Sequence, residues 1–235
     1  MTRASTLAEA FAEVCAMQAP LNARLAAYAD KLRELNFPFA EAYDDLVARL
    51  FSGEVGNMVP ELGAALPQFV LPDRSGLLVS LEELTKQGPV ILSLNRGHWC
   101  PFCRITLRTI AEHNDEIAKT GAQVVSIIPD RQQFTDDLRR TTQHNIRILT
   151  DVDCGYALSL GLVVWVGEHL KTLMKGRGYH LDTYHGNDGW FLPAPATFVV
   201  DGDARIIGRF VDPDFRKRME VDDILSILTR FRSDR

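Results

Sequence analysis

The sequence predicts an α/β protein in which helices flank a central mixed β-sheet and a helical extension precedes the sheet. From about residue 56 onward, short apolar runs typical of buried strands alternate with amphipathic helical patterns. The last of these runs form a hairpin that is followed by a single helix. Residues 1–55 instead repeat apolar residues at helical spacing. We therefore expect an N-terminal helical extension at residues 1–55 and a sheet domain at residues 56–235.

Three helices are expected in the extension. Thr6 and Glu9 match the capping-box pattern that begins a helix. Apolar residues at steps of four and three run through a second helix that opens at Pro20, and residues 38–51 form a third. Two interpretations stay open, because so short an apolar seam suits both: the extension packs on its own domain, or it makes a subunit contact.

The sheet domain is expected to begin with two short strands around a turn at residues 73–76 and a helix that starts at Ser80. Buried strands follow at residues 89–95, 122–128 and 146–150, with helices at residues 100–119, 132–144 and 153–160 after them. A long polar stretch at residues 165–190 predicts a functional loop. The closing hairpin turns at residues 201–203, and the last helix covers residues 221–231.

Composition and charge exclude several classes of protein. The chain has 235 residues and a net charge of −5, which provides no basic surface for nucleic acid. Apolar runs all fall short of the roughly 18 residues that span a bilayer, so no membrane partner is expected. Glu9 and Glu13 interrupt the apolar N-terminal stretch, unlike in a secretory signal peptide. We therefore expect a cytoplasmic protein, in which thiols stay reduced.

Two of the four cysteines, Cys100 and Cys103, lie at a predicted strand-to-helix junction with the sequence NRGHWCPFC. Unpaired amides at a helix N-terminus stabilise a thiolate, and Pro101 suits the first helical turn. Arg96 and Arg104 flank the pair and would further favour the anion. The spacing also allows the two sulfurs to form a disulfide. The pattern therefore predicts a redox pair.

Other interpretations of the pair have less support. A zinc site needs two more ligands, and the sequence has no second CxxC, while His180 and His185 lie far downstream. We therefore expect no metal. We also expect no cofactor, because neither G-x-G-x-x-G nor a P-loop pattern is present. Cys154 is interpreted as a packed thiol, with a distant resolving role as the alternative.

The sequence resembles the peroxiredoxin-like branch of the thioredoxin superfamily, the redoxin or alkyl hydroperoxide reductase/thiol-specific antioxidant group, in a form with a thioredoxin-type CxxC. The resemblance covers residues 56–231 and includes PVILSLNRGHWCPFC, AQVVSIIPD and LPAPATFVVDGDARIIGRFVDPDF. It implies a thioredoxin-like fold. It also implies that Pro195 is a cis-proline that faces the cysteine pair, while Trp99 is interpreted as a wall of the pocket.

The sequence departs from the family's pattern at the attacking cysteine. That pattern places a proline seven residues, and a hydroxyl residue three residues, before the cysteine that attacks peroxide. Counted from Cys103, these positions hold Arg96 and Cys100; counted from Cys100, they hold Ser93 and Gly97. Alignment on the family makes Cys103 the attacker, whereas the thioredoxin pattern makes Cys100 the attacker. The order of attack therefore stays open.

The resemblance implies a thiol-dependent peroxidase, an antioxidant oxidoreductase that reduces hydrogen peroxide or alkyl hydroperoxides. A Cys100–Cys103 disulfide would form and would be reduced by an external thiol, either a thioredoxin-like protein or glutathione. Arg96 would stabilise charge that develops on the peroxide. Two alternatives stay open: a thioredoxin-like oxidoreductase that acts on protein disulfides, and a redox-inactive scaffold that dimerises through the N-terminal helices. A homodimer is the assembly that these helices suggest.

Overall fold

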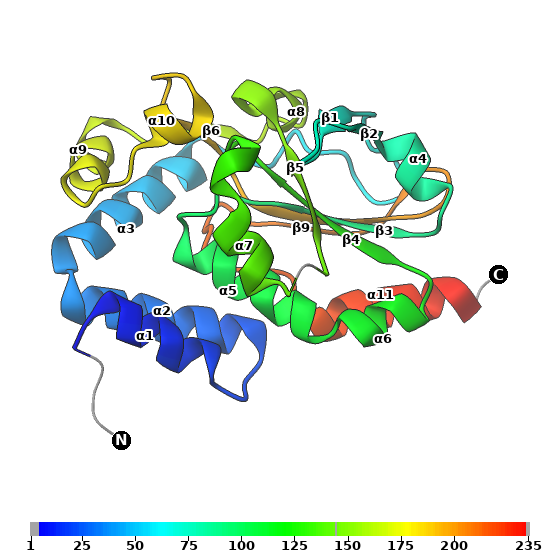
Figure 1. Ribbon diagram of the computed structural model, residues 1–235, viewed down its shortest axis with the longest axis horizontal. Coiled ribbons are helices and arrows are strands. Elements are labelled where there is room, and N and C mark those ends of the chain that lie inside the picture. The colour runs from blue at the N-terminus through cyan, green and yellow to red at the C-terminus, as the bar shows by residue number, and fades with distance from the viewer. Residues whose placement is uncertain (1–4, 144, 234–235) are drawn as a thin grey trace.

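The computed structural model describes residues 5–143 and 145–233, and a five-stranded mixed sheet lies at its centre (Figure 1). The strand order is β5-β4-β3-β8-β9. Strands β3, β4 and β5 are parallel, whereas β8 runs antiparallel to β3 and β9 runs antiparallel to β8. The strands are β3 (Val90–Leu94), β4 (Gln123–Ile128), β5 (Arg147–Thr150), β8 (Ala196–Val200) and β9 (Ile206–Val211). The mixed α/β fold expected from the sequence is confirmed.

Helices cover both faces of the sheet, so every side chain of the central strand β3 is buried. On one face, Ile91 and Val199 belong to an apolar cluster that includes Leu107, Leu138 and Leu228 of the covering helices. These helices are α5 (Pro101–Glu112), α6 (Asn114–Lys119), α7 (Asp136–Thr141) and α11 (Val221–Ser233). Figure 1 shows α5, α6 and α11 together on this side.

The second apolar cluster joins the other face of the sheet to the N-terminal helices. It contains Leu92 of β3, Cys103 of α5 and Leu25 of α2. The cluster therefore includes the cysteine pair and continues into the extension. A hairpin of β1 (Val70–Pro72) and β2 (Leu78–Ser80) lies at the far end, followed by α4 (Leu81–Thr85). The Oγ of Ser80 accepts the Glu83 N–H at 3.1 Å, which confirms the predicted helix start.

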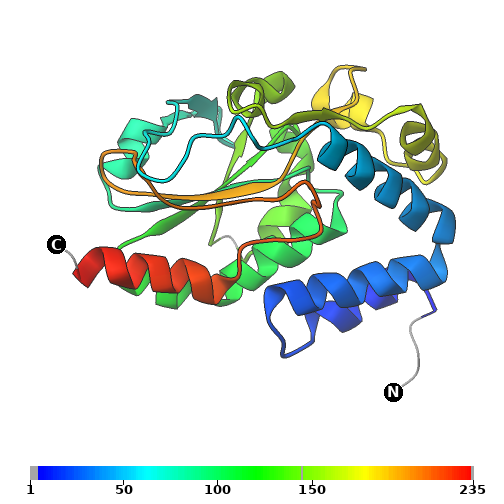
Figure 2. The same ribbon diagram turned by 180° about the vertical axis from the view of Figure 1, so that it is seen from behind.

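The extension forms α1 (Leu7–Cys15), α2 (Leu21–Leu35) and α3 (Phe37–Ser52), as predicted. Thr6 and Glu9 make the expected capping box. Helix α2 packs on its own chain: the Arg24 guanidinium contacts the Glu112 carboxylate of α5 at 2.8 Å. Figure 2 shows the start of α2 beside the start of α11. The interpretation in which the extension packs on its own domain is therefore the one that the structure displays.

The predicted loop at residues 165–190 is wrong, because two helices occupy it. They are α9 (Glu168–Gly176) and α10 (Leu181–His185), and β6 (Val163–Trp165) pairs with β7 (Phe191–Pro193) across their ends. Helix α9 buries only Leu170 and Met174 among its nine residues. Leu170, Leu173 and Met174 do repeat at helical spacing, but only over one turn within a polar stretch, so the sequence favoured a loop there.

Helix boundaries differ from the predictions at three further places. The helix expected at residues 100–119 divides at His113 into α5 and α6. The helix expected at residues 132–144 consists of a 3₁₀ turn at Gln132–Phe134 and α7, and residue 144 lies outside the described residues. Likewise, a 3₁₀ turn at Val152–Cys154 precedes α8 (Gly155–Ser159). Across the described ranges, no helix combines the length and apolarity that crossing a membrane requires.

Candidate active site

The cysteine pair lies where β3 gives way to α5, in a turn that needs glycine. Gly97 has φ of +141°, and a Cβ there would lie 2.5 Å from the Trp99 Nε1 and 2.7 Å from the Asp130 Oδ2. Cys100 is the N-cap of α5, and Pro101 is its first residue, where the missing N–H is not needed. This turn places both cysteines at the end of the sheet where β3 finishes.

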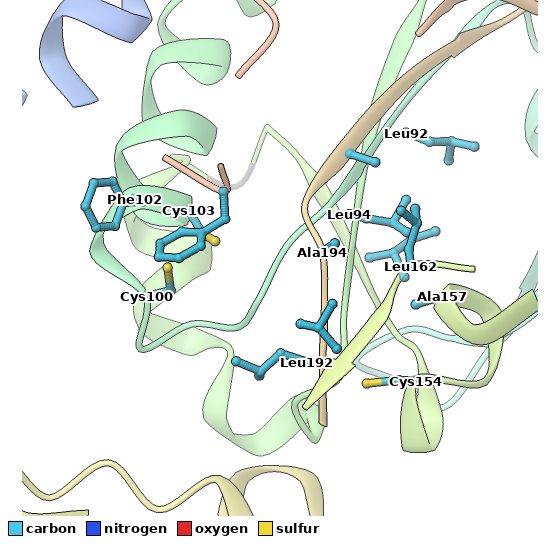
Figure 3. Close-up of a cluster of buried hydrophobic side chains, with 14 of the residues drawn as sticks. Leu92, Leu94, Cys100, Phe102, Cys103, Cys154, Ala157, Leu162, Leu192 and Ala194 are labelled. Carbon is cyan, nitrogen blue, oxygen red and sulfur yellow. The ribbon is translucent and has the colours of Figure 1, made fainter. Parts of the chain in front are cut away.

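Cys100 and Cys103 are both free thiols, and both are fully buried. Figure 3 shows their sulfur atoms pointing toward each other at the start of α5. The interaction between the two side chains raises the pKa of Cys100 and lowers that of Cys103, as it would with Cys100 as the donor. The two sulfurs therefore lie side by side in the structure, as predicted.

The surroundings of Cys103 favour its thiolate. Burial raises the pKa of Cys103, but the Cys100 side chain and the guanidinium groups of Arg218 and Arg96 lower it by more, so that the pKa is about 6. The Arg96 backbone N–H donates to the Cys103 Sγ at 3.3 Å, and the Arg218 Nη2 lies 3.9 Å from the same atom. The amide on the sulfur thus comes from the turn, whereas the sequence led us to expect the amides of the helix itself.

The surroundings of Cys100 have the opposite effect on its pKa. Its pKa is raised well above the ordinary value, first by burial and then because its proton is held in the hydrogen bond to Cys103. Two thiols one helical turn apart are therefore divided into a thiolate and a protonated donor. This division is the property that a nucleophile and its resolving partner require.

Arg96 is held in a cage of aromatic rings. Its Cζ lies 4.0 Å from the ring centre of Phe215, 5.0 Å from that of Tyr43 and 5.1 Å from that of Trp99. The guanidinium is buried, and its Nε and Nη1 have no hydrogen-bond acceptor among the residues that the structure describes. Arg96 therefore brings free donors as well as charge to the cysteine pair. Arg104, the other flanking arginine, instead lies over the Phe11 ring at 4.7 Å.

The predicted cis-proline is wrong. No cis peptide bond occurs in residues 5–143 or 145–233, so the bond before Pro195 is trans. Pro195 is nevertheless buried and directly precedes β8, whose first residue Ala196 pairs with Leu94 at the end of β3. It therefore lies at the end of the sheet that carries the cysteine turn. The cis geometry came from the resemblance alone, since an X-Pro bond is trans by default.

Three further site residues come from distant segments, and the sequence did not identify them. Arg218 and Phe215 lie between β9 and α11, and Tyr43 lies in α3. The sequence DFRKRME, with its basic residues beside an aromatic residue, was the available signal for the first two. Tyr43 falls within the third predicted helix, and nothing in the sequence connects it with Arg96.

A buried carboxylate holds the turn from the other side. Asp130, at the end of β4, accepts the His98 backbone N–H at 2.6 Å and contacts the His98 Nδ1 at 3.0 Å. The His185 Nε2 lies 3.3 Å from the same carboxylate. His98 is thus held in place by Asp130. In the part of the chain that the structure describes, no group of three or more His, Cys, Asp or Glu side chains could hold a metal ion.

The fold and the thiol pair together define a thioredoxin-like thiol oxidoreductase. Residues 62–209 match the AhpC/TSA family, and the chain therefore belongs to this family. As a member, the protein is a thiol-dependent peroxidase, which is an oxidoreductase. No curated protein sequence matches the chain.

Several solved structures have a similar fold. Peroxidoxin BcpB from Mycobacterium tuberculosis is 21% identical, with a TM-score of 0.55, and the match covers 72% of this chain and 97% of that one. Prx3 from Vibrio vulnificus, solved with H2O2, is 17% identical at a TM-score of 0.57, over 72% of this chain and 99% of that one. A mutant of the Peroxiredoxin 6 of Arenicola marina is 16% identical at 0.57, with 74% of each chain covered. At these identities the likeness shows the fold.

Proposed function

We propose that the protein reduces hydrogen peroxide and small alkyl hydroperoxides with Cys103 as the attacking residue and Cys100 as the resolving residue. The observation that carries this assignment is the contact set of one sulfur. The Cys103 Sγ has the Arg96 N–H at 3.3 Å and the Arg218 guanidinium at 3.9 Å, while Cys100 donates its proton toward it. A thiolate, rather than a thiol, is the nucleophile in such a reaction.

The first step transfers one oxygen atom. The Cys103 thiolate attacks the distal oxygen of the hydroperoxide, the O–O bond breaks, and the leaving oxygen takes a proton to become water or an alcohol. Cys103 is oxidised to a sulfenic acid, and the peroxide is reduced. The free Nε and Nη1 donors of Arg96 are suited to stabilise the negative charge on the leaving oxygen.

The second step forms the disulfide. The Cys100 sulfur attacks the sulfenic sulfur of Cys103, hydroxide leaves, and the Cys100 proton converts it to water. The two sulfurs already face each other, so this step needs no rearrangement of distant segments (Figure 3). An external thiol, either a thioredoxin-like protein or glutathione, then reduces the Cys100–Cys103 disulfide by exchange. We also assign Trp99, whose ring lies against the Arg96 guanidinium, and Pro195, which is buried at the same end of the sheet, as supports of the site.

The two alternative functions have less support. In a thioredoxin-like oxidoreductase for protein disulfides, Cys100 would be the first nucleophile, and the raised pKa of Cys100 opposes that use. A redox-inactive scaffold leaves the lowered pKa of Cys103 without a role.

Location, domain boundary and assembly belong to the same proposal. We place the protein in the cytoplasm, where the pair stays reduced between turnovers. Residues 1–55 are assigned to an extension and residues 56–235 to the catalytic domain. A homodimer is the assembly that we expect, and gel filtration with light scattering measures it.

Trapping of the sulfenic acid tests the assignment of the two cysteines. Cys100→Ser should react with peroxide and accumulate a dimedone adduct on Cys103, whereas Cys103→Ser should form no adduct and reduce no peroxide. Peptide mapping by mass spectrometry locates the adduct. An adduct on Cys100 in the Cys103→Ser protein would reverse the two roles. Peroxide oxidation of the wild type no faster than that of free cysteine would end the peroxidase proposal.

A further inference from the structure

The segment between β9 and α11 supplies two groups to the cysteine site. Phe215 lies against the Arg96 guanidinium, and Arg218 reaches the Cys103 Sγ. The Arg218 side chain is buried, and its Nη1 donates to the carbonyls of Phe215 and Lys217. Arg218 therefore depends on the position of its own segment, because a long side chain reaches a fixed point only when its backbone is fixed.

A residue of the extension holds that backbone on both sides. The Asn22 Oδ1 accepts the Arg218 N–H at 2.9 Å, and the Asn22 Nδ2 donates to the Arg218 carbonyl at 2.8 Å. A side-chain amide can make this pair of bonds because it has both a donor and an acceptor. The two residues are 196 positions apart in the sequence. One side chain thus pairs with both peptide groups of the residue that contacts the thiolate.

A second set of bonds fixes Asn22 itself. The Glu220 carboxylate accepts the backbone N–H groups of Leu21 and Asn22, both at 2.9 Å, and the Asn22 Nδ2 at 2.8 Å. A carboxylate at the first turn of α2 is favourable because unpaired amides and the helix dipole meet it there. These hydrogen bonds join the start of α2 to the residue just before α11. Figure 2 shows the two helix starts beside each other.

We propose that Asn22 is a positioning residue of the peroxidase site, which holds the peptide of Arg218 so that the guanidinium stays against the Cys103 Sγ. The inference rests on the proposed function of the cysteine pair. It makes the N-terminal extension, which lies outside the matched family region at residues 62–209, a working part of the active site. The attraction between guanidinium and thiolate weakens with distance, so a loosened Arg218 stabilises the anion less.

The same helix provides a matched control. Arg24, two residues after Asn22, bonds to the Thr109 Oγ1 at 3.2 Å, the Glu112 Oε2 at 2.8 Å and the Ala19 carbonyl at 2.9 Å. These partners lie in α5 and in the chain before α2. Replacing Arg24 therefore weakens the attachment of α2 without touching the bonds to Arg218.

The test is a titration of the Cys103 thiolate by its ultraviolet absorbance in the reduced full chain. The other three thiols have raised pKa values, so Cys103 titrates alone near pH 6. In Asn22→Leu, which keeps the size of the side chain, and in Asn22→Ala, the midpoint should rise by about one pH unit. In Arg24→Met the midpoint should stay, although the melting temperature falls. Equal midpoints in the wild type and in a folded Asn22 variant would overturn the proposal, as would equal shifts in the Asn22 and Arg24 variants.

A double-mutant cycle with Arg218→Met gives an independent test. If Asn22 acts through Arg218, the double variant should show the midpoint of Arg218→Met alone, because the two effects are not additive. Additive shifts would contradict the proposal. The titration uses no peroxide, so an inactive wild type would end the peroxidase proposal while this measurement still decides the role of Asn22.

Discussion

Cys100 and Cys103 lie one helical turn apart, yet their pKa values move in opposite directions. Burial raises both. The Cys100 side chain, the Arg218 and Arg96 guanidinium groups and the Arg96 amide together lower the pKa of Cys103. For Cys100, the Arg96 charge and the Cys103 amide are outweighed by burial and by the Cys103 side chain. Aligned on the family, Cys100 occupies the position of a hydroxyl residue, and in the proposed mechanism its S–H serves the attacking sulfur as that hydroxyl would. One residue would then act first as hydrogen-bond donor and later as resolving thiol.

That double role predicts different behaviour for two variants of Cys100. Cys100→Ser keeps a donor, so its Cys103 should ionise and react with peroxide at nearly the wild-type rate. Cys100→Ala loses the donor, and its Cys103 pKa should rise by about one unit, since a hydrogen bond to a charged group contributes about 1.5 kcal/mol. Thiolate absorbance and single-turnover oxidation measure both quantities. Identical Cys103 pKa values in the Ser and Ala variants would contradict the assigned hydrogen bond.

At the scale of elements, the turn between β3 and α5 holds the site together. Gly97→Ala would place a Cβ within 2.5 Å of the Trp99 Nε1 and 2.7 Å of the buried Asp130 carboxylate, at a backbone conformation that only glycine adopts readily. We expect a loss of about 3 kcal/mol in the free energy of unfolding and slower peroxide oxidation. Chemical denaturation and stopped-flow kinetics measure the two effects.

Gly76 serves as the control for that variant. It also has a positive φ, of +80°, but a Cβ there meets no atom within 4 Å. Gly76→Ala should therefore cost only about 1 kcal/mol and leave peroxide oxidation unchanged. If Gly97→Ala cost no more than Gly76→Ala, the close approach of the turn to Asp130 would not matter for stability.

The elements differ in how well the sequence predicts them, and the reason is periodicity. The buried strands β3 and β4 are continuous apolar runs, and the first helices repeat apolar residues strongly, so both were predicted. Helix α9 repeats Leu170, Leu173 and Met174 at helical spacing over only one turn, and α10 has five residues, so the polar stretch around them predicted a loop. The cis geometry of Pro195 had no support in local propensity, and it failed.

The same contrast holds for the candidate site. Arg96, Trp99 and the two cysteines fall within eight consecutive residues, so local sequence identifies them. Arg218 approaches Cys103 only through the packing of the segment before α11, across 115 positions of sequence. No local pattern encodes such a contact, because it depends on where α2 and α11 meet.

At the scale of the whole molecule, the extension and the sheet share one apolar cluster that passes through the cysteine pair. The charge state of the Cys103 sulfur therefore contributes to the free energy of unfolding of the entire chain. The pKa of Cys103 falls on folding from the value of a free cysteine, about 8.5, to about 6. A lowered pKa gives stability that is complete above pH 9 and is lost as the pH falls through 6, because the unfolded chain binds the proton more tightly.

The reduced protein should therefore become more stable between pH 6 and pH 9. The contribution of this one proton is a slope of about 1.4 kcal/mol per pH unit in the free energy of unfolding. Urea denaturation of the wild type and of Cys103→Ala at several pH values isolates it, since other groups titrate in both proteins. A difference between the two proteins that stays constant from pH 6 to pH 9 would be inconsistent with a thiolate in the folded state.

The most direct test of the ionised Cys103 is the pH dependence of its oxidation by hydrogen peroxide in a single turnover. The rate constant should follow one ionisation with a midpoint near pH 6 and should be level above pH 7. A midpoint near the value of free cysteine, about pH 8.5, would contradict the account.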